Sequence, residues 1–213
     1  MEAIKKQKIT NVNKNIAVID VETNYDSEIF SVGVVIADST NFKLIDKKYW
    51  IIENNWKVGG MYAPNAWLPL EFEQETILVQ TRKEMIVRLI KFLKSYEVKN
   101  WFSYTNYDFR HLPELHESFE YNDISIVAKN KKFNKYIPLN AETTKNGNLK
   151  REWGVENIYR MVTNNENYLE THNALFDAID ELRIMKSLNV GIETFISLNK
   201  NKKNSKPKKK KKN

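Results

Sequence analysis

The sequence contains no cysteine. Disulfide bonds, zinc sites built on thiolates and cysteine nucleophiles are therefore excluded, and a reducing, cytoplasmic location is expected. No apolar run reaches the roughly 18 residues that span a bilayer, so neither a membrane-spanning helix nor a membrane partner is expected. Residues 1–15 are polar and rich in lysine, and they lack the apolar stretch of a secretory signal.

The positive charge of the chain is concentrated at one end. The 213 residues carry a formal net charge of +7, but residues 200–213 hold nine lysines and no acid. Without these nine lysines, 25 of the 34 basic residues remain beside 27 acidic residues, so the rest of the chain carries a slightly negative net charge. We expect a polar N-terminal segment at 1–15, one folded domain at 16–198 and a disordered lysine-rich tail at 199–213.

Three apolar segments near the N-terminus predict strands. Residues 16–21 and 29–37 form near-continuous apolar runs, as in strands that are buried on both faces. Residues 42–52 alternate apolar and charged side chains, which indicates a half-buried strand. Because the spacers between the three segments are short, an antiparallel meander is favoured.

The rest of the chain alternates predicted helices, strands and loops. In chain order they are a loop at 53–80, a helix at 81–96, a strand at 101–104, a helix within 107–119, a strand at 124–128, a loop at 129–151 and helices at 156–162 and 171–188. Pro113 confines the cleaner part of the helix within 107–119 to its C-terminal side. The element order predicts an α/β fold with a mixed sheet.

Two acids stand at the end of the first predicted strand. Asp20 and Glu22 are two residues apart, so their side chains point to the same face of the strand. Two carboxylates this close are costly unless cations neutralise them, which indicates a metal site. The simpler alternative is a strand that ends in solvent with two exposed acids.

A third acid follows the predicted strand at 101–104. Asp108 lies at the junction between this strand and the following helix, and α/β sheets often bind ligands at such junctions. The alternative is an N-cap that stabilises the helix and takes no part in chemistry.

His172 and Asp177 flank the expected start of the last long helix. If that helix begins near Asn173, His172 lies on the preceding loop and approaches a site that Asp177 reaches from the first turn. The alternative is a capping histidine and a surface acid. We interpret Asp180 and Glu181 as solvated helix acids.

The order and placement of these residues resemble one known family. Between about residues 16 and 188 the chain is similar to the DEDDh exonucleases, the DnaQ-like branch of the ribonuclease-H-like fold. The matching residues are Asp20, Glu22 and Thr23 in the first motif, Asn106 and Asp108 in the second, and His172, Ala174, Asp177 and Ala178 in the third. The family often has glycine after the first motif, where this chain has Asn24.

The resemblance implies a ribonuclease-H-like mixed sheet flanked by helices and a metal-dependent 3′-to-5′ exonuclease that releases nucleoside monophosphates. By this likeness, Asp20 bridges two divalent ions, Glu22 and Asp177 complete the first metal site, and Asp108 supports the second. His172 is then the general base that deprotonates the attacking water. Oxygen ligands without thiolates suit Mg²⁺ or Mn²⁺.

The resemblance also implies a nucleic acid with a single-stranded 3′ end as partner, either DNA or RNA. Thr23, Asn106 and Tyr107 are the candidate substrate-binding residues, although an aromatic ring such as that of Tyr107 also suits the core. Aromatic residues in the loop at 53–80 suggest a stacking platform for a single strand or simple packing onto the sheet; they are Tyr62, Trp67 and Phe72.

Two alternatives remain open on partners and role. A separate protein such as a polymerase is one candidate partner. The chain could also be a catalytically idle nucleic-acid-binding module, with the fold as scaffold and the lysine-rich tail on phosphates.

Overall fold

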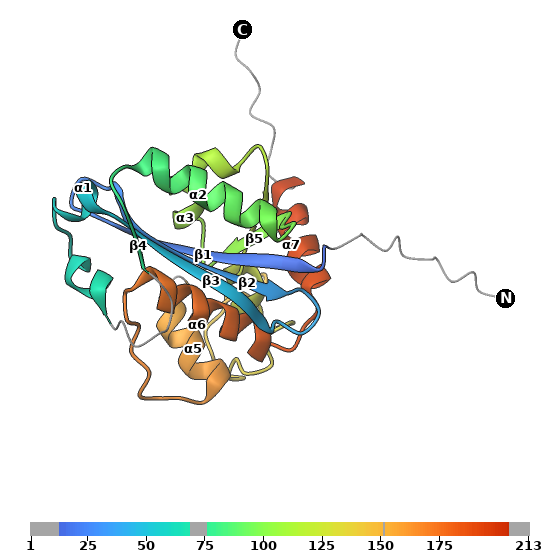
Figure 1. The fold of residues 1–213 in the computed structure, drawn as a ribbon. Coiled ribbons are helices and arrows are strands. Elements are labelled where there is room, and N and C mark those ends of the chain that lie inside the picture. Colours follow the sequence, from blue (N-terminus) through green and yellow to red (C-terminus); the bar gives the residue numbers. More distant parts are fainter. Residues whose placement is uncertain (1–12, 69–75, 151, 205–213) are drawn as a thin grey trace, which may run out of the picture.

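A mixed β-sheet forms the centre of the molecule (Figure 1). The computed structural model describes residues 13–68, 76–150 and 152–204. Strands β1 (Asn15–Thr23), β2 (Ile29–Asp38) and β3 (Leu44–Ile52) form the predicted antiparallel meander. Among the described residues the sheet has six strands, in the order β4-β3-β2-β1-β5-β6.

Parallel strands extend the meander on both sides. On one side β4 (Ile77–Val79) pairs with β3, and on the other β5 (Asn100–Ser103) pairs with β1 and then with β6 (Glu120–Asp123). The carboxyl ends of β1 and β5 therefore meet at one edge of the sheet, which is where an α/β fold places its ligands.

Helices cover both faces of the sheet (Figure 1). Helix α2 (Arg82–Ser95) packs on one face, while α6 (Ala174–Ser187) packs on the other with α5 (Val155–Thr163) against it. The predicted helices at 81–96, 156–162 and 171–188 are confirmed.

The two faces of β1 explain its near-continuous apolar run. Ile16 and Val18 face the core on the α6 side, whereas Ala17 and Ile19 face the core on the α2 side. Because side chains alternate along a strand, the next even-numbered positions, Asp20 and Glu22, also face α6.

Two predicted elements near the sixth strand are wrong. Residues 124–128 do not form a strand, because β6 ends at Asp123 and the apolar run forms the short helix α4 (Ser125–Ala128). A short buried helix and a short buried strand have the same apolar content, so composition does not separate them. The α-helix α3 (Tyr107–His111) lies before Pro113 rather than after it, and Pro113 starts the 3₁₀ turn η2 (Pro113–Leu115).

The segment predicted as a loop at 53–80 contains short elements besides β4. They are the helix α1 (Glu53–Trp56) and the 3₁₀ helix η1 (Ala63–Trp67). Each spans about one turn, which is too short for a helical period to show in the sequence. In the predicted loop at 129–151, the described residues form only isolated β-bridges.

The last helix, α7 (Ile192–Asn204), runs across the predicted boundary of the tail. The prediction of a disordered tail from residue 199 is therefore wrong for residues 199–204. Asn199 is buried and its side chain bonds to both the backbone amide and the carbonyl of Asp123, which anchors the helix to β6. Residues 1–12 and 205–213 lie outside the described residues. No helix in the described part of the chain is long and apolar enough to cross a membrane.

Candidate active site

The close approach of α6 to the sheet creates the candidate site. Asp20 on β1 pairs with Gly33 on β2. A Cβ atom on Gly33 would lie only 2.1 Å from the carbonyl oxygen of Ala174, the first residue of α6. Only a glycine at this position lets the start of α6 rest on the strand, and this contact brings the first turn of α6 to Asp20.

The start of α6 is fixed by its cap. The Asn173 side chain accepts hydrogen bonds from the backbone amides of Leu175 and Phe176, at 3.1 and 3.4 Å. His172 precedes this cap with a φ of +51°, a left-handed conformation that is uncommon for residues other than glycine. The helix thus begins where the sequence predicts, with His172 on the loop and Asp177 in the first turn.

Three of the candidate side chains converge. Glu22, His172 and Asp177 each offer one potential metal ligand, and these atoms all lie within 4.8 Å of one another. Neither alternative from the sequence describes this arrangement, because Asp177 is buried and Glu22 is half-buried rather than exposed.

Asp108 joins the same site from α3, which follows β5 in the chain. It is 2% exposed, and its Oδ1 accepts a hydrogen bond from the backbone amide of Val21, between Asp20 and Glu22, at 3.1 Å. The N-cap position of α3 belongs to Asn106, so the interpretation of Asp108 as an N-cap is wrong. The contact with Val21 instead ties this carboxylate to the end of β1.

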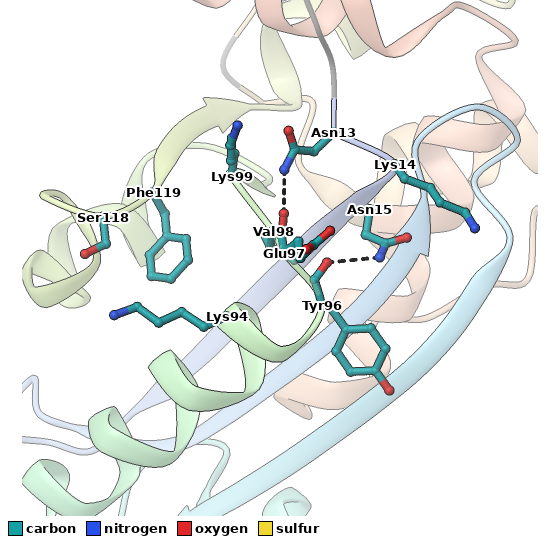
Figure 2. A pocket seen from close by; sticks show the side chains of 10 residues that line it. All are labelled: Asn13, Lys14, Asn15, Lys94, Tyr96, Glu97, Val98, Lys99, Ser118 and Phe119. Atoms are coloured by element: carbon teal, nitrogen blue, oxygen red, sulfur yellow. Dashed lines mark hydrogen bonds between the residues drawn. The ribbon is translucent and has the colours of Figure 1, made fainter.

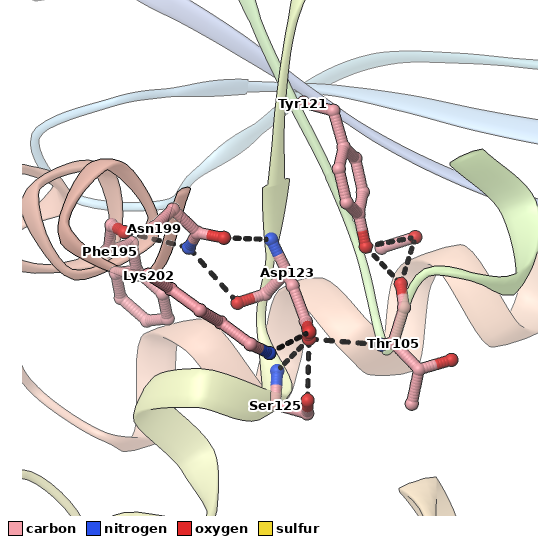
Figure 3. Close-up of polar contacts among 8 residues, drawn as sticks. Thr105, Tyr121, Asp123, Ser125, Phe195, Asn199 and Lys202 are labelled. Atoms are coloured by element: carbon pink, nitrogen blue, oxygen red, sulfur yellow. Dashed lines mark hydrogen bonds and ion pairs between the residues drawn. The ribbon is translucent and has the colours of Figure 1, made fainter. Parts of the chain in front are cut away.

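Thr105, in the loop before α3, is held in an unusual conformation (Figure 3). It has a φ of +74°, although β-branched residues rarely adopt positive values. Its amide donates to the Asp123 carboxylate at 3.2 Å, and its carbonyl accepts from the hydroxyls of Ser103 and Tyr121. Since Lys202 and Asn199 on α7 both contact Asp123, the last helix helps to fix the loop that leads to Asp108.

Burial and mutual repulsion raise the pKa values of the clustered acids. Burial raises the pKa of Asp20 well above its ordinary value, and Asp108 and Asp177 add to the rise. Burial and Glu170 raise the pKa of Glu22 to about 8 and that of Asp177 to about 9. Burial also raises the pKa of Asp108 to about 6, although hydrogen bonds from Ser103 and the backbone oppose the change. Without cations, these four carboxylates cannot all ionise at neutral pH.

The donor set fits hard divalent cations. Asp177 Oδ1 and Glu181 Oε2 are buried and have no hydrogen-bond partner, so both leave a polar oxygen free to bind a ligand. Carboxylate oxygens are the ligands that Mg²⁺ and Mn²⁺ prefer. The residues that could hold such ions are Asp20, Glu22, Asp108 and Asp177.

His172 is held by the segment around η1. The ring of Tyr62 stacks on its imidazole, with ring centres 3.8 Å apart and planes inclined by 13°. Asn65 donates to the carbonyl of Thr171 and accepts from the side chain of Asn173, both at 2.8 Å. The residues on either side of His172 are therefore bonded to the same loop.

The three loop aromatics considered as a stacking platform have different environments. The ring of Tyr62 stacks on His172. Trp67 packs edge-on against Trp56 with ring centres 5.5 Å apart. Phe72 lies outside the described residues.

The candidate substrate-binding residues lie at the rim of the site. The hydroxyls of Thr23 and Tyr107 are 2.8 Å apart, and the Tyr107 ring is exposed rather than part of the core. Asn106 is also exposed. Asn24, which stands where the family often has glycine, does not adopt a left-handed backbone, and its side chain closes the turn by accepting from the amides of Asp26 and Glu28.

Sequence reasoning missed the buried acids on α6. Asp180 and Glu181 are 5% and 1% exposed, so their interpretation as solvated helix acids is wrong. Asp180 accepts from the Tyr168 hydroxyl and pairs with Arg183. One signal was present: Glu181 is four residues after Asp177 and thus on the same face of the helix.

A hollow lies at the end of β1 opposite the acidic site (Figure 2). It has a volume of about 530 Å³ and is lined by Asn15 at the start of the strand and by three lysines, Lys14, Lys94 and Lys99. Glu97 is the one acid among its lining residues, so this hollow does not share the chemistry of the acidic site.

Comparisons with known proteins identify the fold. No protein-family model matches the chain, and no curated protein sequence matches it at a significant level. Among solved structures, a full-length 3′-exonuclease matches with a TM-score of 0.57 and 12% identity, over 83% of this chain and 81% of the other. The nuclease domain of 3′hExo, a DEDDh family member bound to rAMP, matches with a TM-score of 0.55 and 14% identity, over 83% and 92%.

A third match is E. coli Exonuclease I in complex with a 5cy-dT13 oligonucleotide. Its TM-score is 0.50 with 12% identity, and the match covers 89% of this chain but 42% of the other. These likenesses confirm the predicted fold, a mixed sheet flanked by helices, which the chain shares with the matched exonuclease structures.

Proposed function

We propose that the chain is a metal-dependent 3′-to-5′ exonuclease that hydrolyses phosphodiester bonds of DNA or RNA and releases nucleoside monophosphates. The observation that carries this proposal is the convergence of acids from β1, α3 and α6 beside His172, with a buried Asp177 oxygen that has no partner. The likeness of the fold to 3′-exonucleases supports it.

Two divalent cations, Mg²⁺ or Mn²⁺, would be held by the four carboxylates. Asp20 would contact both cations, Glu22 and Asp177 would complete the first site, and Asp108 would support the second. When bound, a cation pair stabilises the charge that develops on the entering and leaving oxygens of an in-line phosphoryl transfer.

His172 would act as the general base. Burial lowers the pKa of its imidazole, although Glu156 opposes the change, so the ring is neutral at pH 7 and can accept a proton from the attacking water. Tyr62 stacks on one face of the ring and keeps it directed toward Glu22 and Asp177. The position of a ring nitrogen within 4.8 Å of carboxylate oxygens of Glu22 and Asp177 supports this role.

Residues at the rim would position the end of the substrate. Thr23 and Tyr107 present a joined pair of hydroxyls, and Asn106 lies exposed at the start of α3. The nucleotide and oligonucleotide in the matched structures support a single-stranded 3′ end as the ligand. Neither the described residues nor the matched structures point to a separate polymerase partner.

Comparison of binding with turnover tests the proposal. Asp20→Asn and Asp177→Asn should abolish degradation of a labelled single strand, while the strand still binds. Deletion of 205–213 keeps α7 intact, removes most of the terminal lysines and should leave the single-turnover rate at saturating substrate unchanged. If wild type binds nucleic acid without degrading it, and binding is lost on deletion of 205–213, the chain is the idle binding module instead.

A further inference from the structure

Glu181 is a buried acid that the proposed mechanism does not use. It lies on α6 one turn after Asp177 and is 1% exposed. An ionised carboxylate at such a position is stable only with a counter-charge or a full set of hydrogen bonds. The surroundings of its two oxygens therefore indicate what it does.

One oxygen of Glu181 is satisfied and the other is not. Oε1 accepts a hydrogen bond from the backbone amide of Tyr104 at 2.9 Å, which ties the side chain to the residue after β5. Oε2 is buried and has no hydrogen-bond partner. No ion pair in the described part of the chain includes Glu181.

The neighbours of Glu181 are the candidate metal ligands. Besides burial, Asp108 has the largest effect on its pKa, which is raised well above the ordinary value, and Asp177 contributes as well. Glu181 in turn contributes to the raised pKa of Asp20. The carboxylate therefore lies close enough to Asp20, Asp108 and Asp177 to interact with them electrostatically, and its bond to Tyr104 ties it to the end of β5 that leads to Asp108.

The adjacent acid on the same helix shows the contrast. Asp180 is also buried, but Tyr168 donates to one of its oxygens at 2.7 Å and Arg183 pairs with the other at 2.8 Å. Its charge is satisfied by the protein itself. On Glu181, by contrast, only Oε1 has a hydrogen-bond partner, and the charged side chains that affect its pKa are all acids.

We infer that Glu181 is a fifth acidic group of the metal site and would help Asp20 and Asp108 to hold a cation, directly or through a water molecule. This inference rests on the proposed function for the presence of that cation. It gives the unpartnered Oε2 a ligand and offsets the repulsion among the acids. The competing explanation is a carboxylic acid that keeps its proton and has only a structural role.

Glu181→Gln separates the two explanations. The amide has the same shape, keeps the oxygen that accepts from Tyr104 and removes the negative charge. Mn²⁺ is titrated into the chain without nucleic acid, and its affinity is measured by calorimetry for wild type, Glu181→Gln and the control Asp180→Asn. We expect Glu181→Gln to weaken the second Mn²⁺ by about 10- to 100-fold, as loss of a supporting metal-site residue does. Asp180→Asn should bind Mn²⁺ like wild type.

Unchanged Mn²⁺ affinity in Glu181→Gln would overturn the inference. Thermal melting in EDTA verifies that this variant folds, and we expect it to melt no lower than wild type because the neutral amide does not have to take up a proton on burial. Glu181→Asp is a second variant that keeps the charge, and it should bind the second Mn²⁺ more tightly than Glu181→Gln. Equal affinities of the Asp and Gln variants would also contradict a role of the charge.

The titration does not depend on catalysis, so the two proposals can fail separately. A wild-type chain that binds two Mn²⁺ ions but degrades no nucleic acid would contradict the exonuclease and leave the role of Glu181 supported by its Mn²⁺ data. A wild-type exonuclease whose Glu181→Gln variant keeps full Mn²⁺ affinity would contradict the role of Glu181 alone.

Discussion

The conformation of His172 depends on its neighbours. Its left-handed φ of +51° has a cost, which the surrounding contacts must offset. The stacked ring of Tyr62 and the hydrogen bonds of Asn65 to Thr171 and Asn173 supply these contacts. The orientation of the proposed base is therefore determined by a loop that is distant in the sequence.

Removal of the Tyr62 ring should impair the base. We expect Tyr62→Ala to lower kcat by about 10-fold or more, since general-base catalysis is worth roughly 10²- to 10⁴-fold, while Tyr62→Phe keeps the stack and most of the activity. In a His172→Ala background, Tyr62→Ala should cause little further loss. An equal loss in both backgrounds would show that Tyr62 acts independently of His172.

The pH dependence of the reaction should reflect the environment of His172. Burial lowers the pKa of its imidazole, so the neutral, proton-accepting form persists below the ordinary value of 6.5. At saturating Mg²⁺, which would hold the clustered carboxylates in their ionised forms, the single-turnover rate should therefore fall with decreasing pH only below about 6.5, the unperturbed histidine value. Rates measured from pH 5 to 8 test this, and an acid limb centred above 6.5 would contradict it.

The sequence predicted the convergence at the start of α6 but not the burial of Glu181. The spacing of Asp20 and Glu22 and the helix start after His172 were sufficient to predict which side chains point toward one another. The spacing of Glu181 from Asp177 indicated a shared face of α6, but the burial of Glu181 also depends on how closely this face meets the sheet and on the position of the β5 end. Charged residues on a helix are more often solvated, and that expectation failed here.

The contact between β2 and α6 governs the site at the scale of elements. Gly33 leaves room for the backbone of Ala174, and α6 packs directly on β1 and β2. Because Asp177 and His172 both belong to the start of α6, their distance from Asp20 follows from this contact.

Gly33→Ala should separate α6 from the sheet. A Cβ atom 2.1 Å from a backbone oxygen cannot be accommodated without a shift, and overpacking of this kind costs about 1–3 kcal/mol or more of unfolding free energy. Urea denaturation and the exonuclease rate should both show a loss. The matched control is Gly154→Ala, where a Cβ meets nothing within 4 Å and φ is −75°, so only a small change is expected. Equal effects at both positions would contradict the role of Gly33.

The elements that the sequence predicted are the long and periodic ones. Strands β1 and β2 and helices α2 and α6 are long enough for their apolar runs or their helical period to be recognised in the sequence. The helix α4 and the strand β6 were misplaced because each has only four residues, and tertiary packing decides such short segments.

At the scale of the whole molecule, the acidic site stores electrostatic repulsion that cations would relieve. Several carboxylates from β1, α3 and α6 share one buried region and have raised pKa values. Folding without metal therefore favours their protonated forms, whereas folding with metal favours their ionised forms. Stability should depend on pH in opposite ways in the two conditions.

The metal-free chain should lose stability as pH rises. Burial raises the pKa of Asp177 to about 9 in the folded chain, above the ordinary 3.8, so its protonated form stabilises the fold below pH 4 and this contribution is lost progressively up to pH 9. In EDTA, the urea midpoint should be lower at pH 8 than at pH 5. Added Mn²⁺ should raise the midpoint at pH 8 more than at pH 5, and Asp177→Asn should reduce both effects. A midpoint in EDTA that rises between pH 5 and 8 would contradict this account.

The central claim is that the acidic site removes nucleotides from a 3′ end with the help of divalent cations. The most direct measurement is a time course on 5′-labelled single-stranded DNA and RNA of identical sequence, with Mg²⁺, Mn²⁺ or EDTA, beside Asp177→Asn. We predict a ladder that shortens from the 3′ end with either metal, and none with EDTA or with the variant. Intact substrate under every metal, or equal degradation by Asp177→Asn, would contradict the claim.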